Sequence, residues 1–372
     1  MIKVLSIIGT RPEAIKMAPV VKELSRHPDQ FDSVVCVTGQ HRQMLDQVLE
    51  LFGIAPEYDL NLMKDNQSLS ELTANLFMGL EKVITTEKPD WILAQGDTTT
   101  VMVASLVAFY HKISFGHIEA GLRTGNKFSP FPEEINRCIA DIVSDVFFAP
   151  TELSGKTLIQ EGARESDIYI TGNTVIDALL DIASRPYDGQ LGLLKEISAD
   201  KRIVLITAHR RESFGEPFRE LCEAIRELAQ EFIDEGVEFV YPVHLNPNVL
   251  QPVNELLSGQ QNVHLIEPLD YLSLVHIMKR STIILTDSGG IQEEAPSLNV
   301  PVLVMRETTE RPEGLDAGVV KLVGTHKRSI VEKATRLLRD PDFHAHMAKG
   351  ANPYGDGKSA ARIVSILKER SS

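Results

Sequence analysis

The sequence predicts an α/β protein built from two doubly wound domains, and three observations lead to this fold class. Short runs rich in Val and Ile alternate with longer segments that place apolar residues at i, i+3 and i+4. The short runs are almost entirely apolar, as are the strands of parallel sheets that helices cover on both faces. A weakly patterned stretch, Ser184–Lys201, separates two halves with the same order of elements. We therefore expect two domains that face each other across a cleft.

The predicted elements follow from these runs in chain order. Strands of the first half are expected at Lys3–Ile8, Ser33–Thr38, Trp91–Ala94, Ser114–His117 and Val146–Ala149. Strands of the second half are expected at Ile203–Thr207, Glu238–Tyr241, Val263–Leu265, Thr282–Thr286 and Val302–Val304. The clearest helix patterns are Glu13–Ser25, Ser68–Thr86, Pro132–Ser144, Glu216–Phe232, Tyr271–Arg280 and Ser359–Glu369. The predicted domains are therefore residues 1–183, with a C-terminal helix within 356–372 packing back onto them, and residues 184–355.

Composition and charge exclude several classes of protein. The chain has 372 residues, of which 43% are hydrophobic and 24% charged, so a disordered tail, a collagen-like fibre and a disulfide scaffold are excluded. Lys plus Arg is 38 and Asp plus Glu is 52, which gives a net charge of −14. This balance argues against nucleic acid or an anionic membrane as a partner. It leaves open an anionic small molecule held by a few cations.

Cysteine content and hydropathy favour a cytoplasmic protein. Cys36, Cys138 and Cys222 lie far apart without CxxC spacing, so neither a disulfide framework nor a zinc site is expected. The longest candidate membrane segment, Thr98–Tyr110, is shorter than the roughly 18 apolar residues that a span requires. The N-terminal apolar run Val4–Ile8 is too short for a secretory signal.

Dense polar sequence follows the predicted strands, where ligands of open parallel sheets bind. The segments are Gly9–Glu13, Thr38–Gln43, Gln95–Thr100, His117–Arg123, Thr207–Glu212, Pro242–Asn246 and Asp287–Gly290. One polar segment after a strand is what any surface loop contains. Seven such segments, expected at the same edge of the fold, predict a ligand-binding site.

Two of these segments resemble anion-binding turns. Ser288, Gly289 and Gly290 join a strand to a helix without side-chain bulk, so their N–H groups either meet a phosphate or simply begin the helix. Gly9–Arg11 leaves the same two interpretations open, with Arg11 able to clasp a diphosphate. Neither segment matches GxGxxG or GxxxxGK[ST], which argues against a nicotinamide cofactor and an NTPase.

Carboxylates and bases at the strand ends indicate proton transfer at carbon. Asp97, Glu119 and one of the pair Glu133 and Glu134 are the candidate acids, although Asp97 is also placed to cap a helix. His209 is followed by two arginines, and this setting favours a role for His209 in an anion site over a structural role. Lys16 is either a solvated helix residue or a phosphate-side cation. No third ligand lies at helical distance from the His/Glu pairs, so we predict no catalytic metal.

These motifs resemble the non-hydrolysing UDP-N-acetylglucosamine 2-epimerases. The matching segments are GTRPEAIKMAPVV, GQHRQMLDQVL, QGDTTT, HIEAGLRTGN, FPEEINR, TGNTVIDAL, TAHRRESFGEP, YPVHLNPNV and TDSGGIQEEAPSLNVPVLVMRETTERPEG. The resemblance implies two Rossmann-like domains in a GT-B-like arrangement, a homodimer and a closing cleft. It also implies interconversion of UDP-N-acetylglucosamine and UDP-N-acetylmannosamine. In this family UDP is eliminated to give 2-acetamidoglucal and then re-added, without a redox cofactor, and the product is expected to serve polysaccharide synthesis.

The resemblance also implies roles for individual residues. It assigns acid/base work around C2 to Asp97, Glu119 and Glu133, with Lys16 and His209 also needed for catalysis. It leaves open which acid acts on which face of C2. Substrate contacts are implied for Arg11, Arg137, Tyr271, Ser288, Gly289, Gly290, Glu294 and Arg311. A regulated subgroup binds a second UDP-N-acetylglucosamine, and its pocket matches Gln40, Gln43, Arg210 and His244. Its arginine before the Ser68 helix is replaced here by Asn66, so this chain lacks one phosphate-binding cation of that pocket.

Two alternatives to the epimerase remain open. A glycosyltransferase on the same architecture would share the nucleotide contacts, and an idle nucleotide-sugar sensor would bind without turnover. Several acids around C2 favour the epimerase, because transfer to an acceptor does not need them. The intact set of acids, with His209 and Lys16, argues against the sensor.

Overall fold

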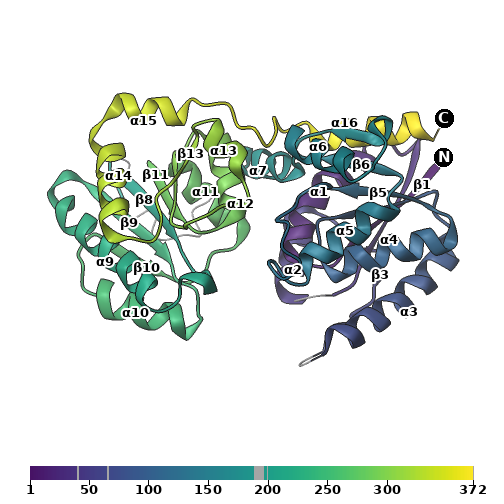
Figure 1. Cartoon of the computed structure of the whole chain (residues 1–372), viewed down its shortest axis with the longest axis horizontal. Helices are drawn as coiled ribbons and strands as arrows, with labels where there is room; N and C mark the ends of the chain where they lie inside the picture. The colour runs from purple at the N-terminus through teal and green to yellow at the C-terminus, as the bar shows by residue number, and fades with distance from the viewer. Residues whose placement is uncertain (40–41, 65–66, 188–196, 199, 372) are drawn as a thin grey trace. The chain divides into compact units, whose positions relative to one another are not determined.

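The protein divides into two compact units, each a parallel β-sheet with helices interleaved between its strands (Figure 1). The computed structural model describes residues 1–39, 42–64, 67–187, 197–198 and 200–371. Unit 1 is Met1–Ala178 with Tyr354–Ser372, and unit 2 is Leu179–Pro353. This architecture confirms the predicted α/β fold class. No helix in these described ranges is long and apolar enough to cross a membrane.

Unit 1 contains a seven-stranded sheet in the order β3-β2-β1-β4-β5-β6-β7. In chain order the strands are β1 (Ile2–Ile8), β2 (Phe31–Val37), β3 (Tyr58–Asp59), β4 (Trp91–Gln95), β5 (Ser114–Ile118), β6 (Val146–Ala149) and β7 (Ile168–Ile170). All neighbouring pairs are parallel. The central strands are apolar because helices cover both of their faces, and every residue of β1 from Val4 to Ile8 is fully buried.

The helices of unit 1 pack on this sheet. They are α1 (Arg11–Ser25), α2 (Arg42–Phe52), α3 (Leu69–Glu87), α4 (Thr99–His111), α5 (Glu133–Val143), α6 (Glu152–Gln160), η1 (Glu165–Asp167), α7 (Thr174–Ser184, which continues into unit 2) and α16 (Ser359–Arg370). Helices α3, α4 and α5 share one apolar core with β1, β4 and β5. The C-terminal helix α16 contacts α1, and Trp91 of β4 donates a hydrogen bond to Ser371 just beyond it.

Unit 2 repeats the same winding with six strands in the order β10-β9-β8-β11-β12-β13. The strands are β8 (Arg202–Thr207), β9 (Val237–Pro242), β10 (Val263–Ile266), β11 (Ile283–Thr286), β12 (Val302–Val304) and β13 (Val320–Leu322). The helices are η2 (Arg211–Ser213), α9 (Glu216–Glu231), η3 (Ile233–Glu235), α10 (Pro247–Leu257), α11 (Tyr271–Arg280), α12 (Gly289–Glu294), η4 (Ala295–Leu298), α13 (Pro312–Asp316), α14 (Lys327–Arg339) and α15 (Pro341–Ala348). One core cluster joins α9, α10 and α14 to the sheet.

Every strand predicted from the sequence is present, with ends that differ by at most two residues. The prediction missed β3, β7 and β13, each of which is two or three residues long and lies at an edge of its sheet. Their side chains are mostly half-buried or exposed. An edge strand needs no continuous apolar run, so periodicity alone does not detect it.

Candidate active site

The candidate residues of unit 1 lie near the carboxyl ends of three neighbouring strands, β1, β4 and β5. Arg11 and Lys16 belong to the helix that follows β1, Asp97 comes two residues after β4, and Glu119 directly follows β5. The chain winds from β1 to β2 and β3, then returns to β4 on the other side of β1. The connections after β1 and β4 therefore diverge, which is where doubly wound sheets bind their ligands.

Several donors hold the carboxylate of Glu119. Its Oε2 accepts a hydrogen bond from Lys16 Nζ, one from Gln95 Nε2 at 2.7 Å and one from Asn173 Nδ2 at 3.4 Å. The backbone of Glu119 has a φ of 68°, in the left-handed region that a non-glycine residue rarely adopts. Its N–H donates to the Phe148 carbonyl at 3.0 Å, which holds this conformation. Backbone strain of this kind concentrates at functional sites.

Asp97 is paired with a cation and anchored through its backbone. Arg137 Nη2 donates to Asp97 Oδ2, and Asn136 Nδ2 donates to the Asp97 carbonyl at 3.0 Å. Both partners come from α5, so this helix orients Asp97 beside the end of β4. The Asp97 side chain keeps 30% of its surface exposed, against 7% for Glu119. A carboxylate that is oriented and still accessible is suited to proton transfer.

The two glutamates that begin α5 have different surroundings. Glu134 is buried and accepts hydrogen bonds from the backbone N–H groups of Thr124 and Gly125, at 3.0 and 2.8 Å. It also lies 3.4 Å from Arg137 Nη1. Within the described ranges, the half-buried Glu133 side chain makes no hydrogen bond or ion pair. Glu134 therefore holds the loop in place, while Glu133 is available to a ligand.

Glu13 is a buried acid that the sequence reasoning did not select. Only 3% of it is exposed, and its Oε2 accepts the backbone N–H groups of Gly9 and Thr10. Burial raises the pKa of Glu13 to about 7, and the nearby charge of Asp97 acts in the same direction. Glu13 therefore occupies the Gly9 and Thr10 amides, which favours the interpretation in which this turn begins the helix. The exposed Arg11 side chain remains as the cation of this turn. The spacing Thr10-x-x-Glu13 is that of a capping box, and this signal could have identified Glu13.

In unit 2, a buried carboxylate organises the loop that carries His209. Asp287 follows β11, is fully buried, and accepts hydrogen bonds at Oδ2 from the N–H groups of His209 and Arg210, both at 2.7 Å. Its Oδ1 lies 3.7 Å from His209 Nδ1. The His209 ring stacks on His244, with centroids 5.3 Å apart and planes 7° from parallel. Partial burial lowers the pKa of His209, and the charges of His244 and Arg210 lower it further. The Asp287 carboxylate acts in the opposite direction.

The turn before α12 has open backbone and a guanidinium beside it. The N–H of Ser288 donates to Thr286 Oγ1 at 2.9 Å. A Cβ at Gly289 would come within 2.8 Å of Arg311 Nη1, so the guanidinium lies against this glycine. Arg311 also donates from Nε to Glu293 at 2.5 Å. A Cβ at Gly290 would meet no atom closer than 4.0 Å, so this backbone is accessible to a ligand.

Tyr271 and Glu294 form a second pair in unit 2. The Tyr271 hydroxyl donates to Glu294 Oε1 at 2.8 Å, and both residues are largely buried. Tyr271 begins α11 and Glu294 ends α12, so two helices supply the pair.

Among the residues assigned to a second ligand, Gln40 and the side chain of Gln43 lie outside the described residues, as does Asn66. Arg210 and His244 lie beside His209.

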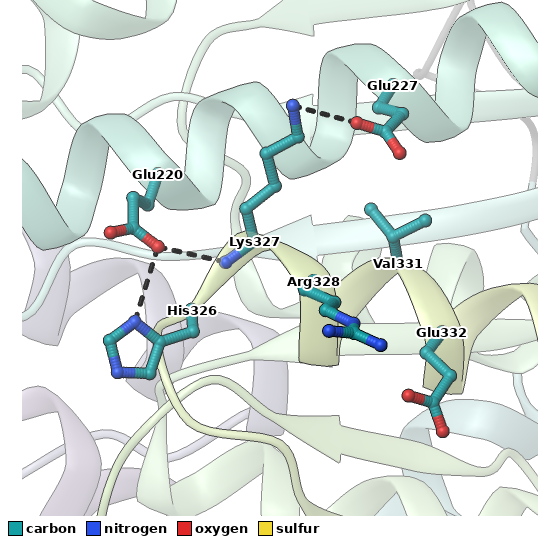
Figure 2. Close-up of a pocket in the computed structure, with 7 residues that line it drawn as sticks. All are labelled: Glu220, Glu227, His326, Lys327, Arg328, Val331 and Glu332. Atoms are coloured by element: carbon teal, nitrogen blue, oxygen red, sulfur yellow. Dashed lines mark hydrogen bonds and ion pairs between the residues drawn. The ribbon is translucent and has the colours of Figure 1, made fainter.

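A pocket on the surface of unit 2 is not part of this site. It has a volume of about 650 Å³ between α9 and α14 and is lined by Glu220, Glu227, His326, Lys327, Arg328, Val331 and Glu332 (Figure 2). Glu220 accepts the Lys327 N–H at 3.1 Å and contacts His326 Nδ1 at 3.3 Å, while Lys327 Nζ lies 2.8 Å from Glu227. None of the candidate residues described above lines this pocket.

Comparison with known proteins matches nearly the whole length of the chain. A model of the UDP-N-acetylglucosamine 2-epimerase family matches residues 22–368. The UDP-N-acetylglucosamine 2-epimerase of Escherichia coli O157:H7 is 52% identical over 373 residues, which cover 98% of each chain. That of Bacillus subtilis is 50% identical over 366 residues, covering 98% of this chain and 95% of the relative. The crystal structure of UDP-GlcNAc 2-epimerase from Neisseria meningitidis bound to UDP-GlcNAc is 50% identical, with a TM-score of 0.89 over 99% of this chain and all of that one.

Proposed function

The chain belongs to the UDP-N-acetylglucosamine 2-epimerase family, and from this premise we propose that it interconverts UDP-N-acetylglucosamine and UDP-N-acetylmannosamine. It is therefore an isomerase. The observation that best supports this reaction is the pair of cation-bound carboxylates at adjacent strand ends, Glu119 with Lys16 and Asp97 with Arg137. Inversion at C2 requires proton removal on one face and proton delivery on the other, so more than one acid/base group is needed.

The proposed route is elimination followed by addition. A carboxylate takes the C2 proton, the C–H electron pair forms a C1=C2 double bond, and the bond from C1 to the diphosphate oxygen breaks. UDP leaves with the electron pair of the broken C1–O bond, which gives 2-acetamidoglucal. A second acid/base group then delivers a proton to the other face of C2 as UDP attacks C1 again. No net oxidation occurs, so the chemistry itself calls for no redox cofactor.

We assign the two ends of the substrate to different residues. The sugar is assigned to Asp97, Glu119, Glu133 and Lys16 of unit 1, with Arg11 and Arg137 as cations for the diphosphate side. The nucleotide is assigned to Tyr271, Ser288, Gly289, Gly290, Glu294 and Arg311 of unit 2, with His209 at the diphosphate. The accessible backbone at Gly290 and the adjacent Arg311 guanidinium support the phosphate assignment.

Proton NMR in D2O tests the reaction. UDP-N-acetylglucosamine incubated with the enzyme is expected to give a growing manno signal with deuterium at C2, because the removed proton exchanges with solvent before its return. No acceptor sugar should be needed. Turnover that requires an added acceptor, with the C2 proton retained, would instead identify a glycosyltransferase.

Arg11→Ala is expected to weaken UDP binding by roughly 1.5–3 kcal/mol, because it removes a charge-assisted contact to the diphosphate. Titration calorimetry with UDP measures this loss. The matched control is Arg26→Ala at the other end of α1, where the side chain is exposed and paired with Glu23. The control should bind UDP as the parent does. Parental affinity in Arg11→Ala would remove Arg11 from the diphosphate site.

We also propose that the enzyme is a homodimer that associates through α3 and α4. These helices contact each other and expose Met78, Phe109 and Tyr110, each with more than half of its surface accessible. Tyr110 stacks on Phe77 at 6.1 Å, which joins the two helices into one apolar face. Light scattering should give twice the chain mass for the parent and the chain mass for Phe109→Glu with Met78→Lys. A parent that stays monomeric at micromolar concentration would contradict this.

A cytoplasmic location is proposed from the thiols. Cys36 and Cys222 are buried, Cys138 is half-buried, and all three are free. Burial raises the pKa of Cys36 and of Cys222 to about 12, so these two are unreactive thiols. Free thiols are typical of proteins that work in a reducing compartment.

A further inference from the structure

His117 is a fully buried histidine whose ring contacts an acceptor on each side. It lies on β5, and none of its surface is exposed. Its Nδ1 lies 2.6 Å from Asp141 Oδ1, and its Nε2 lies 2.7 Å from the carbonyl oxygen of Gly96. A carbonyl oxygen carries no hydrogen, so Nε2 must donate to it. The question is then whether Nδ1 also carries a proton.

The surroundings of Asp141 answer this question. Its other oxygen, Oδ2, accepts a hydrogen bond from Arg123 Nη2 at 2.6 Å and one from the Gly121 N–H at 3.3 Å. A carboxylate bound by a guanidinium is ionised and accepts only, so His117 Nδ1 is a donor as well. A neutral imidazole has one N–H, and two donating nitrogens make His117 an imidazolium.

The charges around the ring agree with this assignment. Burial lowers the pKa of His117, but the Asp141 carboxylate on α5 and the hydrogen bond to the Gly96 carbonyl together more than offset that, and the net pKa is raised. Arg123, from the loop after β5, acts in the opposite direction and is itself paired with Glu161 at the end of α6. Burial would raise the pKa of Asp141, yet His117 and Arg123 together lower it.

The ring holds the peptide that precedes Asp97. Gly96 has a φ of 87°, its N–H donates to the Ile118 carbonyl at 3.0 Å, and its own carbonyl accepts from His117. On the other side, Asn136 donates to the Asp97 carbonyl. The peptides before and after Asp97 are therefore each tied to a buried side chain, while Arg137 orients the carboxylate itself.

We propose that the His117 imidazolium, held by Asp141, is a positioning residue that fixes the Gly96–Asp97 peptide and thereby aims the Asp97 carboxylate at the sugar. This inference rests on the proposed role of Asp97 in the epimerisation. His117 does not touch the substrate; it acts through the backbone of the loop. Losing the Nε2 hydrogen bond frees the peptide to rotate and displaces the carboxylate, and small displacements of a catalytic group are costly to the chemical step.

Two amide substitutions separate the two hydrogen bonds of the ring. The amide nitrogen of glutamine occupies about the position of Nε2, and that of asparagine about the position of Nδ1. His117→Gln can therefore still donate to Gly96, whereas His117→Asn can reach only Asp141. We expect kcat to fall about tenfold or more in His117→Asn and to be largely retained in His117→Gln, with UDP affinity parental in both. Equal kcat losses in the two variants, or parental kcat in His117→Asn, would overturn the proposal.

The charge state is measured on the parent enzyme, which keeps the inference testable if either variant fails to fold. Nitrogen NMR of ¹⁵N-histidine-labelled protein should show both His117 nitrogens protonated at pH 7.5. As the pH rises, the ring should lose its Nδ1 proton and keep its Nε2 proton, because the Gly96 carbonyl can only accept. A neutral ring at pH 7.5, or an unprotonated Nε2, would overturn the proposal. Absence of any epimerase activity in the parent would instead count against the proposed function. The NMR experiment would still report the protonation state of the His117 ring.

Discussion

Replacing Glu119 by glutamine is expected to lower kcat by about 10²–10⁴, the usual scale for a lost general acid or base. Glutamine keeps the size of the side chain, but it cannot take or deliver the C2 proton. Its amide oxygen can still accept from Lys16, Gln95 or Asn173, so the fold around this position should persist. Asp97→Asn and Glu133→Gln are expected to fall in the same range, because they share the work on C2.

The measurement pairs initial rates by NMR with UDP affinity by calorimetry. UDP affinity should change little in Glu119→Gln, since this carboxylate is assigned to the sugar. The matched control is Glu23→Gln, near the last turn of α1, where the carboxylate pairs with Arg26. The control should keep parental kcat. A Glu119→Gln enzyme with parental kcat and lost UDP binding would mean that the carboxylate has been assigned to the wrong end of the substrate.

Asp141→Asn is expected to cost about 3–5 kcal/mol of unfolding free energy, the scale for removing one partner of a buried charge pair. The carboxylate accepts from His117, Arg123 and the Gly121 N–H. An asparagine has one acceptor oxygen and turns an NH₂ group toward the remaining donors. His117 and Arg123 then stay buried without their counter-charge. Urea unfolding followed by Trp91 fluorescence measures this change, because the chain has a single tryptophan and it is buried in unit 1.

The pH dependence of this loss follows from the two pKa shifts. The raised pKa of His117 gives stability that is fully present below the ordinary value of 6.5 and is lost as pH rises through the folded-state pKa. The lowered pKa of Asp141 gives stability that is fully present above 3.8 and is lost as pH falls through its folded-state pKa. The effect of Asp141→Asn should therefore be largest between about pH 4 and 6.5.

An exposed ion pair provides the control for Asp141→Asn. Asp356 pairs with Arg362 in the same unit, and about half of the Asp356 side chain is accessible. Asp356→Asn should change stability by no more than about 1 kcal/mol, because solvent screens such pairs. Equal effects of the two substitutions would show that the buried pair contributes no more than a surface contact.

The fold was predictable from sequence where burial controls composition. Strands such as β1 and β4 are buried on both faces, so their residues must be apolar and the pattern is visible in one sequence. The edge strands β3, β7 and β13 need not be apolar on both faces. They are identified only by their pairing with a neighbouring strand. The winding order then follows from the alternation of strands and helices.

Candidate site residues were predictable where unusual side chains follow a strand, and not where a residue acts through the backbone. Asp97 and Glu119 stand out because each follows an apolar run within three residues. Glu13 lies on a helix and looks like a solvated first-turn acid, yet it takes the amides of the Gly9 turn. In the sequence, Asp287 is only the first residue of a glycine-rich turn, yet in the structure it holds the His209 loop. These roles depend on contacts between distant segments, which the chain order does not display.

The claim that UDP is eliminated to a free glycal is tested most directly by following one long incubation. The parent enzyme, held with UDP-N-acetylglucosamine well past equilibrium with the manno epimer, should slowly accumulate UDP and 2-acetamidoglucal in equal amounts, because the intermediate occasionally escapes before UDP adds back. Proton NMR distinguishes the vinylic proton of the glycal from every sugar in the mixture. Free N-acetylmannosamine as the main early product, with no vinylic signal, would identify a hydrolysing enzyme and contradict the account.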